Sequence, residues 1–156
     1  MPITNLSGEK TLVQWVNIQS GGVMTTSTAI PYDDTIPQKT EGMQVMAVTI
    51  TPKSASNTLI IGTIAMLSVS TASQVCITAL FQDSTTGALA AMSGTPPING
   101  TACIKMTHKM TAGTTSATTF KVRAGATTNT VTFNGGQGSR LFGGVVASSM
   151  TIYEVR

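Results

Sequence analysis

The sequence predicts an all-β domain, a jelly-roll sandwich of about ten short antiparallel strands. Thr, Val, Ile, Gly and Ser dominate the composition, whereas helix-favouring residues such as Leu, Glu, Lys and Arg are scarce. Turn signals rich in Gly, Pro, Asn and Ser recur between short apolar stretches, and no stretch has the period of a long helix. A length of 156 residues suits one domain. We expect residues 1–10 to form an N-terminal arm and residues 11–156 to form the domain.

The first half of the chain contains five strand patterns and one long connection. Trp15 lies in the first strand, where a core or interface position is more common than a ligand platform. Pro31 and Pro37 bracket a connection over 30–42, which we expect to run along a sheet edge as an ordered loop. Its adjacent Asp33 and Asp34 suit turn capping better than cation binding, because neighbouring carboxylates on an extended chain point apart. The expected strands are 12–19, 23–28, 44–51, 58–69 and 74–83.

The stretch 59–67 is apolar at both odd and even positions. A strand of an antiparallel sandwich usually alternates, because one of its faces meets the core and the other meets water. Continuous apolar character therefore predicts that one face packs in the domain core and the other meets another chain. This stretch is the main residue-level indication of an oligomer.

The second half continues the pattern of strands and turns. The alternation in 101–111 places His108 on an apolar face, which predicts a hydrogen-bonded core histidine. The chain ends on a strand with Met150 and Ile152 on one face, and we expect that strand to lie centrally in a sheet, near a subunit contact. The proline-rich loop 93–100 suits either a binding role or a tolerated insertion. The expected strands are 88–92, 101–111, 118–124, 131–133 and a final strand from residue 150.

Charge is sparse and unevenly distributed. Only 10% of the residues are charged, and the net charge is +3. No acidic residue lies between Asp83 and Glu154, so the second half is basic. That half either forms a solvated basic face or meets an acidic partner surface. Cys76 and Cys103 are expected to be buried free thiols rather than a disulfide, since nothing in the sequence indicates a secretory context.

The residues also argue against several classes of function. The single histidine, His108, is expected to be buried and so argues against a nucleophilic triad. No Cys and His residues cluster at metal-ligand spacing, and the six acids are too few and too scattered to suggest a glycosidase pair. Few aromatic residues and no basic run argue against nucleic-acid binding, and no apolar run is long enough to cross a membrane as a helix. We therefore expect no enzyme activity, no catalytic or metal site and no cofactor.

Six segments of the chain carry a resemblance to a known family. They are IPYDDTIPQ at 30–38, EG at 41–42, ALFQD at 79–83, MTAGTTSATTFKVRAG at 110–125, RLFGG at 140–144 and MTIYE at 150–154. These segments resemble a family of bacteriophage virion proteins with jelly-roll domains similar to tumour-necrosis-factor-like trimers. The family occurs in tail-fibre genes and as small head-decoration proteins. The resemblance covers most of residues 12–156, and its motifs are more specific for the fold than for a position on the particle.

The resemblance implies a homotrimer that is assembled in the host cytoplasm and resides in the virion. The expected role is a capsid decoration or cement protein that stabilises the head shell by binding the major capsid protein or other virion proteins. The alternative is a trimeric tail-fibre or receptor-binding tip that recognises a host surface glycan. We expect the trimer interface at Leu59, Ile61, Met66, Met150, Ile152 and Tyr153. We expect the capsid or partner contact at Asn5, Lys10, Tyr32, Asp33 and Asp34.

Overall fold

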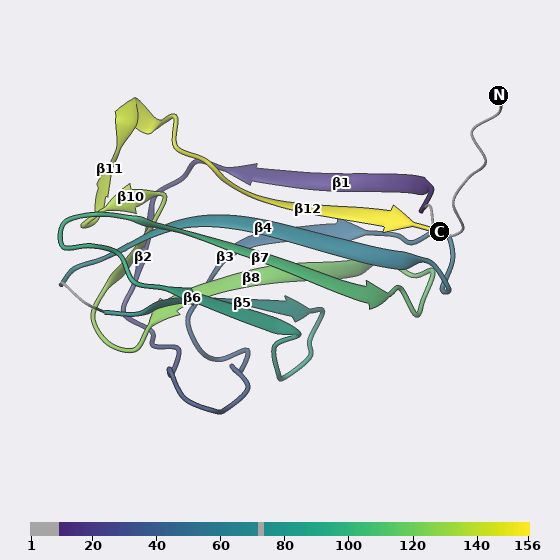
Figure 1. Ribbon diagram of the computed structural model, residues 1–156, viewed down its shortest axis with the longest axis horizontal. Helices are drawn as coiled ribbons and strands as arrows, with labels where there is room; N and C mark the ends of the chain where they lie inside the picture. Colours follow the sequence, from purple (N-terminus) through teal and green to yellow (C-terminus); the bar gives the residue numbers. More distant parts are fainter. Residues whose placement is uncertain (1–9, 72–73) are drawn as a thin grey trace, which may run out of the picture.

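The computed structural model describes residues 10–71 and 74–156, which form an all-β sandwich (Figure 1). These residues contain twelve strands and one short 3-10 helix. The elements are β1 (Leu12–Ser20), β2 (Met24–Thr26), β3 (Met43–Ile50), β4 (Thr58–Val69), β5 (Cys76–Gln82), β6 (Ala90–Gly94), β7 (Ala102–Thr111), β8 (Thr118–Ala126), β9 (Val131–Phe133), β10 (Gly135–Gly136), β11 (Ser139–Arg140), η1 (Phe142–Gly144) and β12 (Ser148–Val155).

The strands form two main antiparallel sheets. In the first sheet the order is β1-β12-β4, with β7 on the free side of β4, and β9 and β2 continuing from the far end of β4. The second sheet has the order β3-β8-β5-β6, and β10 and β11 form a separate small ribbon. The number of strands exceeds the expected ten chiefly because two-residue strands such as β10 and β11 leave no readable period in the sequence.

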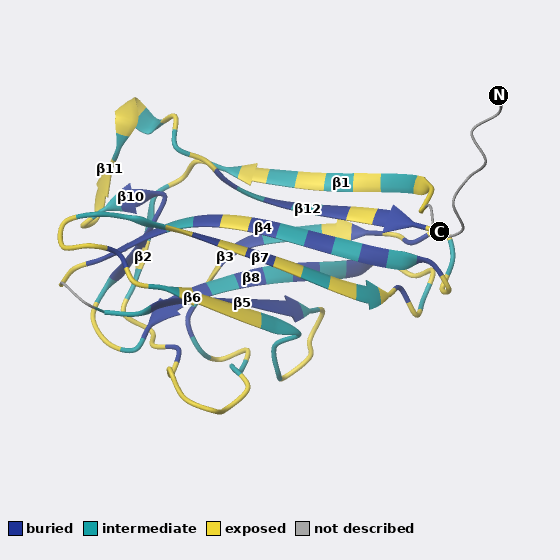
Figure 2. Cartoon of the chain, viewed as in Figure 1, coloured by how far each residue is buried: buried dark blue, intermediate teal, exposed yellow. Residues whose placement is uncertain are grey.

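The core lies between the two sheets and is built by alternation along each strand. In β4 the odd-numbered residues from Leu59 to Leu67 are buried, whereas the even-numbered ones are half-buried or exposed (Figure 2). Phe120 and Val122 of β8 face them from the second sheet, and both are fully buried. Because successive side chains of a strand point to opposite faces, one apolar run supplies both a core face and an outer face.

The final strand occupies the central position that the sequence predicts. β12 lies between β1 and β4, with Val16 opposite Ile152 on one side and Ile61 opposite Ile152 on the other. Met150 and Ile152 are fully buried. Hydrogen bonds to two neighbouring strands thus hold the end of the chain in place.

This arrangement corrects four of the expected interface residues. Leu59, Ile61, Met150 and Ile152 are fully buried inside the single chain, so their side chains cannot contact another chain. The two sheets cover each other's inner faces, and these four positions share the inner face. Met66 and Tyr153 lie on the outer face, and for them the interface stays a prediction.

The connection between β2 and β3, seen at the bottom of Figure 1, covers the outer face of the second sheet instead of following only an edge. The amide of Ile30 donates to the carbonyl of Ala126 at 3.0 Å, and the Ile30 side chain is fully buried. A Cβ on Gly125 would lie 2.8 Å from Ile30 Cγ1, so the glycine permits this close approach. Further along, Gln38 pairs with Gly87 as an isolated bridge.

The two cysteines differ in their surroundings, and both are free thiols. Cys76 is buried, and that burial raises its pKa to about 11. Cys103 is exposed, contrary to the expectation that both are buried. It alternates with Ile104 and Met106 along β7 and so faces outward, on the same side as Lys105.

Candidate interaction surfaces

The outer face of the first sheet carries large apolar side chains in register across three strands, β1, β12 and β4. One row across the sheet joins Trp15 of β1, Tyr153 of β12 and Ile60 of β4, each opposite the next, and ends at Lys109 of β7. Directly opposed side chains lie close enough to pack together. Trp15 is 59% exposed and Tyr153 is 42% exposed, so this row forms a wide aromatic surface.

Two further rows complete the surface. In one, Thr151 lies opposite Gly62, and in the next, Ser149 lies opposite Ile64, which is 42% exposed. Met66 extends the apolar surface towards Cys103. We call the outer positions Trp15, Ile60, Gly62, Ile64, Met66 and Tyr153 the apolar face.

Gly62 leaves a hollow in the middle of the apolar face. A Cβ added there would meet nothing within 4 Å, so the fold of the single chain does not require a glycine. The hollow has a volume of about 290 Å³ and is bordered by Ile64, Thr151 and Tyr153. A glycine inside a strand weakens the strand and often marks a place where another molecule approaches the backbone closely.

Positive charge borders the apolar face on one side. Lys105 and Lys109 are exposed on the outer side of β7, opposite Ile64 and Ile60 respectively. The acid nearest in sequence to this face is Glu154 of β12, and it points inward. Such an edge suits a partner surface that carries carboxylates.

The carboxylate of Glu154 is buried and accepts several hydrogen bonds. Asn57 Nδ2 donates at 2.6 Å, Gln14 Nε2 at 2.5 Å, and the amides of Lys53 and Ser54 at 2.8 and 3.3 Å. Burial alone would raise the pKa of Glu154, but these hydrogen bonds outweigh it and hold the pKa below its ordinary value. The carboxylate therefore ties β12 to β1 and to the turn before β4.

The role of Glu154 was not predicted from the sequence. The alternation along β12 could have indicated it, because position 154 has the same parity as Met150 and Ile152, whose side chains are buried. A carboxylate on a buried face requires hydrogen-bond donors, which here come from a turn of Ser and Asn residues.

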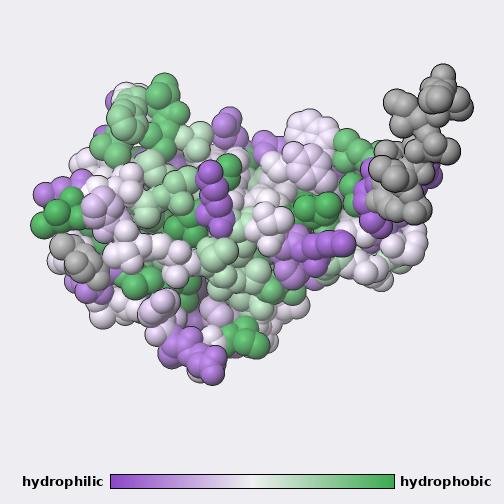
Figure 3. Space-filling view, viewed as in Figure 1, coloured by the Kyte–Doolittle hydropathy of each residue, from purple (hydrophilic) through white to green (hydrophobic). Residues whose placement is uncertain are grey.

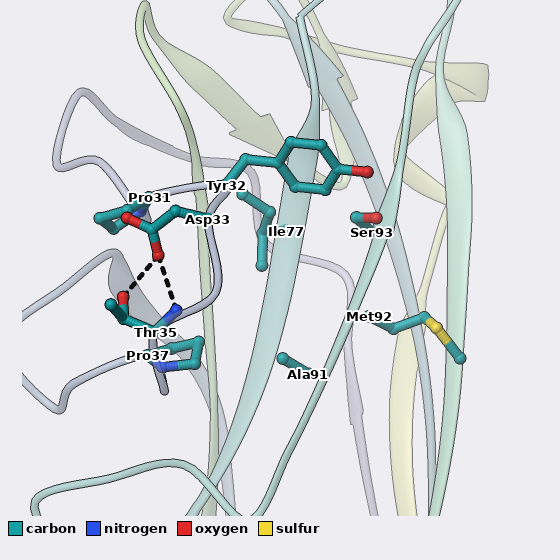
Figure 4. A pocket seen from close by; sticks show the side chains of 9 residues that line it. All are labelled: Pro31, Tyr32, Asp33, Thr35, Pro37, Ile77, Ala91, Met92 and Ser93. Atoms are coloured by element: carbon teal, nitrogen blue, oxygen red, sulfur yellow. Dashed lines mark hydrogen bonds between the residues drawn. The ribbon is translucent and has the colours of Figure 1, made fainter.

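A second candidate site lies between the β2–β3 connection and the edge of the second sheet (Figure 4). The pocket has a volume of about 190 Å³ and is lined by Tyr32 and Asp33 on one side and by Ile77, Met92 and Ser93 on the other. Tyr32 is 65% exposed, and its ring extends across the upper part of the pocket towards Ser93. The pocket combines an aromatic ring with a carboxylate and a hydroxyl group.

Asp33 acts as a turn cap, as predicted. Its Oδ1 accepts from the amide of Thr35 at 2.9 Å and from the Thr35 hydroxyl at 2.5 Å. These bonds lower the pKa of Asp33. Asp34 is exposed in the same turn, and Lys10 is exposed beside β1, whereas the predicted contact Asn5 lies outside the described residues. Tyr32, Asp33 and Asp34 are thus together, and the structure does not place Lys10 beside them.

An apolar tip projects at one end of the sandwich, where Figure 3 shows hydrophobic side chains over β11 and η1. Phe142 is 75% exposed and Val145 is 83% exposed. Phe142 has a φ of 47°, a conformation that is uncommon for a bulky residue. Asn134 donates to Ser20 O at 2.6 Å and accepts from the Ser148 hydroxyl at 2.6 Å, which joins the chain just before the tip segment to the chain just after it.

Other predicted features are located as follows. His108 is half-buried and shares the core-facing side of β7 with Ile104 and Met106, as its alternation predicts. Within residues 10–71 and 74–156, His, Cys, Asp and Glu side chains form no group of three that could hold a metal ion. In the same ranges, no helix has the length and apolar character needed to cross a membrane.

Comparisons with known proteins give distant structural likenesses only. No family model matches the chain, and no curated protein matches it. A solved Bacillus endospore appendage, described as belonging to a family of disulfide-linked pili, has 16% identity and a TM-score of 0.31 over 96% of this chain and 97% of its own. The enzymatically active domain of bacteriophage CBA120 tailspike protein 4 has 12% identity and a TM-score of 0.28 over 79% of this chain. The match spans 19% of that tailspike chain.

Proposed function

We propose that this chain is a structural protein of a bacteriophage virion, acting as a homotrimeric decoration or cement protein on the head shell. In this role it binds copies of itself and the major capsid protein or another virion protein, and it catalyses no reaction. The sequence resemblance motivates the virion assignment. The apolar face is the observation that supports the proposed self-association.

The finer fold assignment belongs to the same proposal. We infer a jelly roll, because β1-β12-β4-β7 and β3-β8-β5-β6 have the order expected when a folded antiparallel hairpin wraps into two four-stranded sheets. Under this assignment β2, β9, β10 and β11 are additions at one end of the sandwich.

The composition of the apolar face supports self-association. An aromatic pair, Trp15 and Tyr153, lies in one row with Ile60, and Ile64 lies two rows further along the same outer face. Contiguous apolar surfaces of this kind are uncommon on proteins that exist alone in water, and aromatic residues are enriched at interfaces. A second copy seated on this face would fill the hollow over Gly62.

A valine at position 62 tests this use of the face. Gly62→Val should leave the single chain folded, because the added side chain meets open space and valine suits a strand. It should disrupt association by filling the hollow, which sedimentation velocity would detect as a loss of the trimer. A matched control, Gly22→Val, adds the same side chain at a glycine between β1 and β2, where an added Cβ also meets nothing within 4 Å, and should leave the trimer intact. A trimer of Gly62→Val with unchanged affinity would contradict the proposed interface.

The shell contact is proposed for residues 1–10 or for the connection 30–42. In the connection, Tyr32 and Asp34 are exposed and could contact a partner, and they lie beside the second sheet, away from the apolar face. Deletion of residues 1–10 should yield a trimer that no longer adds to undecorated shells, as judged by imaging of particles. A Tyr32→Ala chain provides the parallel test of the connection. Undiminished addition by both variants would remove these segments from the proposal.

The pocket beside Tyr32 favours one alternative, a trimeric tail-fibre or receptor-binding tip that recognises a host surface glycan. An exposed aromatic ring next to a carboxylate and a serine offers a stacking surface and polar partners for a sugar. Imaging of whole particles distinguishes the two roles, because the decoration protein lies on the head and the alternative lies on the tail.

A further inference from the structure

Three cationic side chains converge on a hollow on the outer side of the second sheet. Lys39 comes from the β2–β3 connection, and Lys121 and Arg123 come from alternate positions of β8, so they share a face. The hollow has a volume of about 240 Å³, and Asp83 and Gln44 also line it. We call it the basic hollow. It is separate from the apolar face, which belongs to the other sheet.

Main-chain carbonyl groups hold the three cations in position. Lys39 Nζ donates to Ser84 O at 3.2 Å, and Lys121 Nζ donates to Asp83 O at 2.8 Å. Arg123 donates twice, from Nε to the main-chain carbonyl of Glu41 at 2.6 Å and from Nη2 to that of Gly42 at 2.7 Å, while the Glu41 carboxylate accepts from the amide of Gln38 at 2.8 Å. A carbonyl group accepts a hydrogen bond without cancelling the charge. Each cation also keeps further N–H donors for a ligand.

One carboxylate, Asp83, lines the basic hollow and lowers its positive charge. Asp83 Oδ1 accepts from the amide of Thr119 at 2.8 Å, so this carboxylate is held against the end of β8. Three positive charges from Lys39, Lys121 and Arg123 and one negative charge from Asp83 leave a net charge of two positive on the lining. The repulsion between neighbouring cations would be relieved by an anion placed among them.

We propose that the basic hollow binds a compact oxyanion, namely a sulfate, phosphate or carboxylate group, either free or carried by an acidic sugar. Arg123 Nε and Nη2 already bind main-chain carbonyls, so the N–H groups of Nη1 and the second N–H of Nη2 are the ones that remain for the oxygens of such a group. The lysines add charge-assisted hydrogen bonds. The amide of Gln44 supplies a further neutral donor at the same opening. This site does not depend on the proposed virion role, and it remains accessible if the apolar face is covered.

The test is a titration of the isotopically labelled full chain with sodium sulfate, followed by nuclear magnetic resonance. Sodium chloride at equal ionic strength provides the reference for general salt effects. The amide signals of residues 39, 84, 121 and 123 should move in a saturable way, with a midpoint on the order of millimolar. Titration with glucuronate forms the second arm. If glucuronate binds more tightly than sulfate, the natural ligand of the basic hollow is an acidic sugar. If glucuronate binds equally or more weakly, the ligand is a free oxyanion.

Lys121→Gln and its matched control Lys109→Gln make the test specific. Both variants remove one positive charge, but Lys109 lies on β7 of the other sheet. The Lys121 variant should bind sulfate about tenfold more weakly, whereas the control should bind it like the unaltered chain. Arg123→Lys keeps the charge but loses the guanidinium N–H groups, and an intermediate affinity is expected. Absence of saturable shifts, identical shifts with chloride, or equal affinities of the Lys121 and Lys109 variants would overturn the proposal.

Discussion

The two faces of the first sheet carry similar apolar residues but have different surroundings. On the inner face, Ile61 and Ile152 lie opposite each other and are fully buried against the second sheet. On the outer face, Ile60 and Tyr153 lie opposite each other one position away, and Tyr153 is substantially exposed. The fold of the single chain buries the first pair completely. A strand that is apolar on both parities thus has one face that the fold of the single chain buries and one that it leaves partly exposed, and we propose that a partner covers the second.

The largest difference between the faces should appear in stability. Ile61→Ala removes buried methyl and methylene groups and leaves a cavity, so it should lower the free energy of unfolding by about 2–5 kcal/mol. Ile60→Ala, on the outer face of the same strand, should cost under about 1 kcal/mol in the isolated chain. Urea denaturation of both variants at low protein concentration measures the difference. Equal losses would remove the distinction between the two faces.

Glu154 extends the comparison to a polar group on the inner face. Glu154→Gln keeps the shape but turns an amide towards donors such as Asn57 Nδ2, so unfolding should become easier by about 1–3 kcal/mol. Asp34→Asn, at an exposed position of the β2–β3 connection, is the matched carboxylate-to-amide change, with an expected effect within about 0.5 kcal/mol. A Glu154→Gln chain as stable as the unaltered one would mean that the carboxylate contributes little to the fold.

The same carboxylate predicts a pH dependence of stability. Its pKa in the folded chain lies below the ordinary value of 4.5, so the unfolded chain binds more protons in the acidic range. The stabilising contribution is therefore complete above about pH 5 and declines as the pH falls through the lower pKa of the folded state. Thermal unfolding from pH 7 to pH 3 should show a shallower acid loss for Glu154→Gln. Parallel pH profiles of the two chains would contradict this assignment.

The smallest expected effect concerns the turn at Asp33. Thr35→Val removes the hydroxyl donor to Asp33 Oδ1 and keeps the amide donor, so global stability should change by under about 0.5 kcal/mol. The pKa of Asp33 should rise towards its ordinary value, which carbon-detected magnetic resonance of the carboxyl group would report. An unchanged pKa would show that the hydroxyl group does not stabilise the carboxylate.

Much of the fold could be predicted because alternation directly records which face of a strand is buried. The period of β7 placed His108 with Ile104, and the period of β12 placed Met150 with Ile152. The run 59–67 could not be assigned in the same way, because both of its faces are apolar and only the position of the second sheet decides between them. Leu59 and Ile61 were therefore expected at an interface and are found in the core.

The candidate sites depend on contacts between segments that are distant in sequence. Lys39 and Arg123 meet in the basic hollow because the β2–β3 connection folds over the second sheet, and no local pattern indicates that path. The hollow over Gly62 likewise depends on how β4 lies beside β12. Tyr32 and Asp33 could be identified as a loop pair from the sequence alone, since flanking prolines mark the connection.

The central claim is that the apolar face is covered by copies of the same chain. Sedimentation equilibrium of the full chain tests it directly, because the chain mass of 16.1 kDa separates a trimer clearly from a single chain. We expect three chain masses for the unaltered protein and one chain mass for Ile60→Lys, with the Ile60 variant still folded by circular dichroism. A mass of one chain for the unaltered protein at every concentration, or a trimer that survives Ile60→Lys, would contradict it.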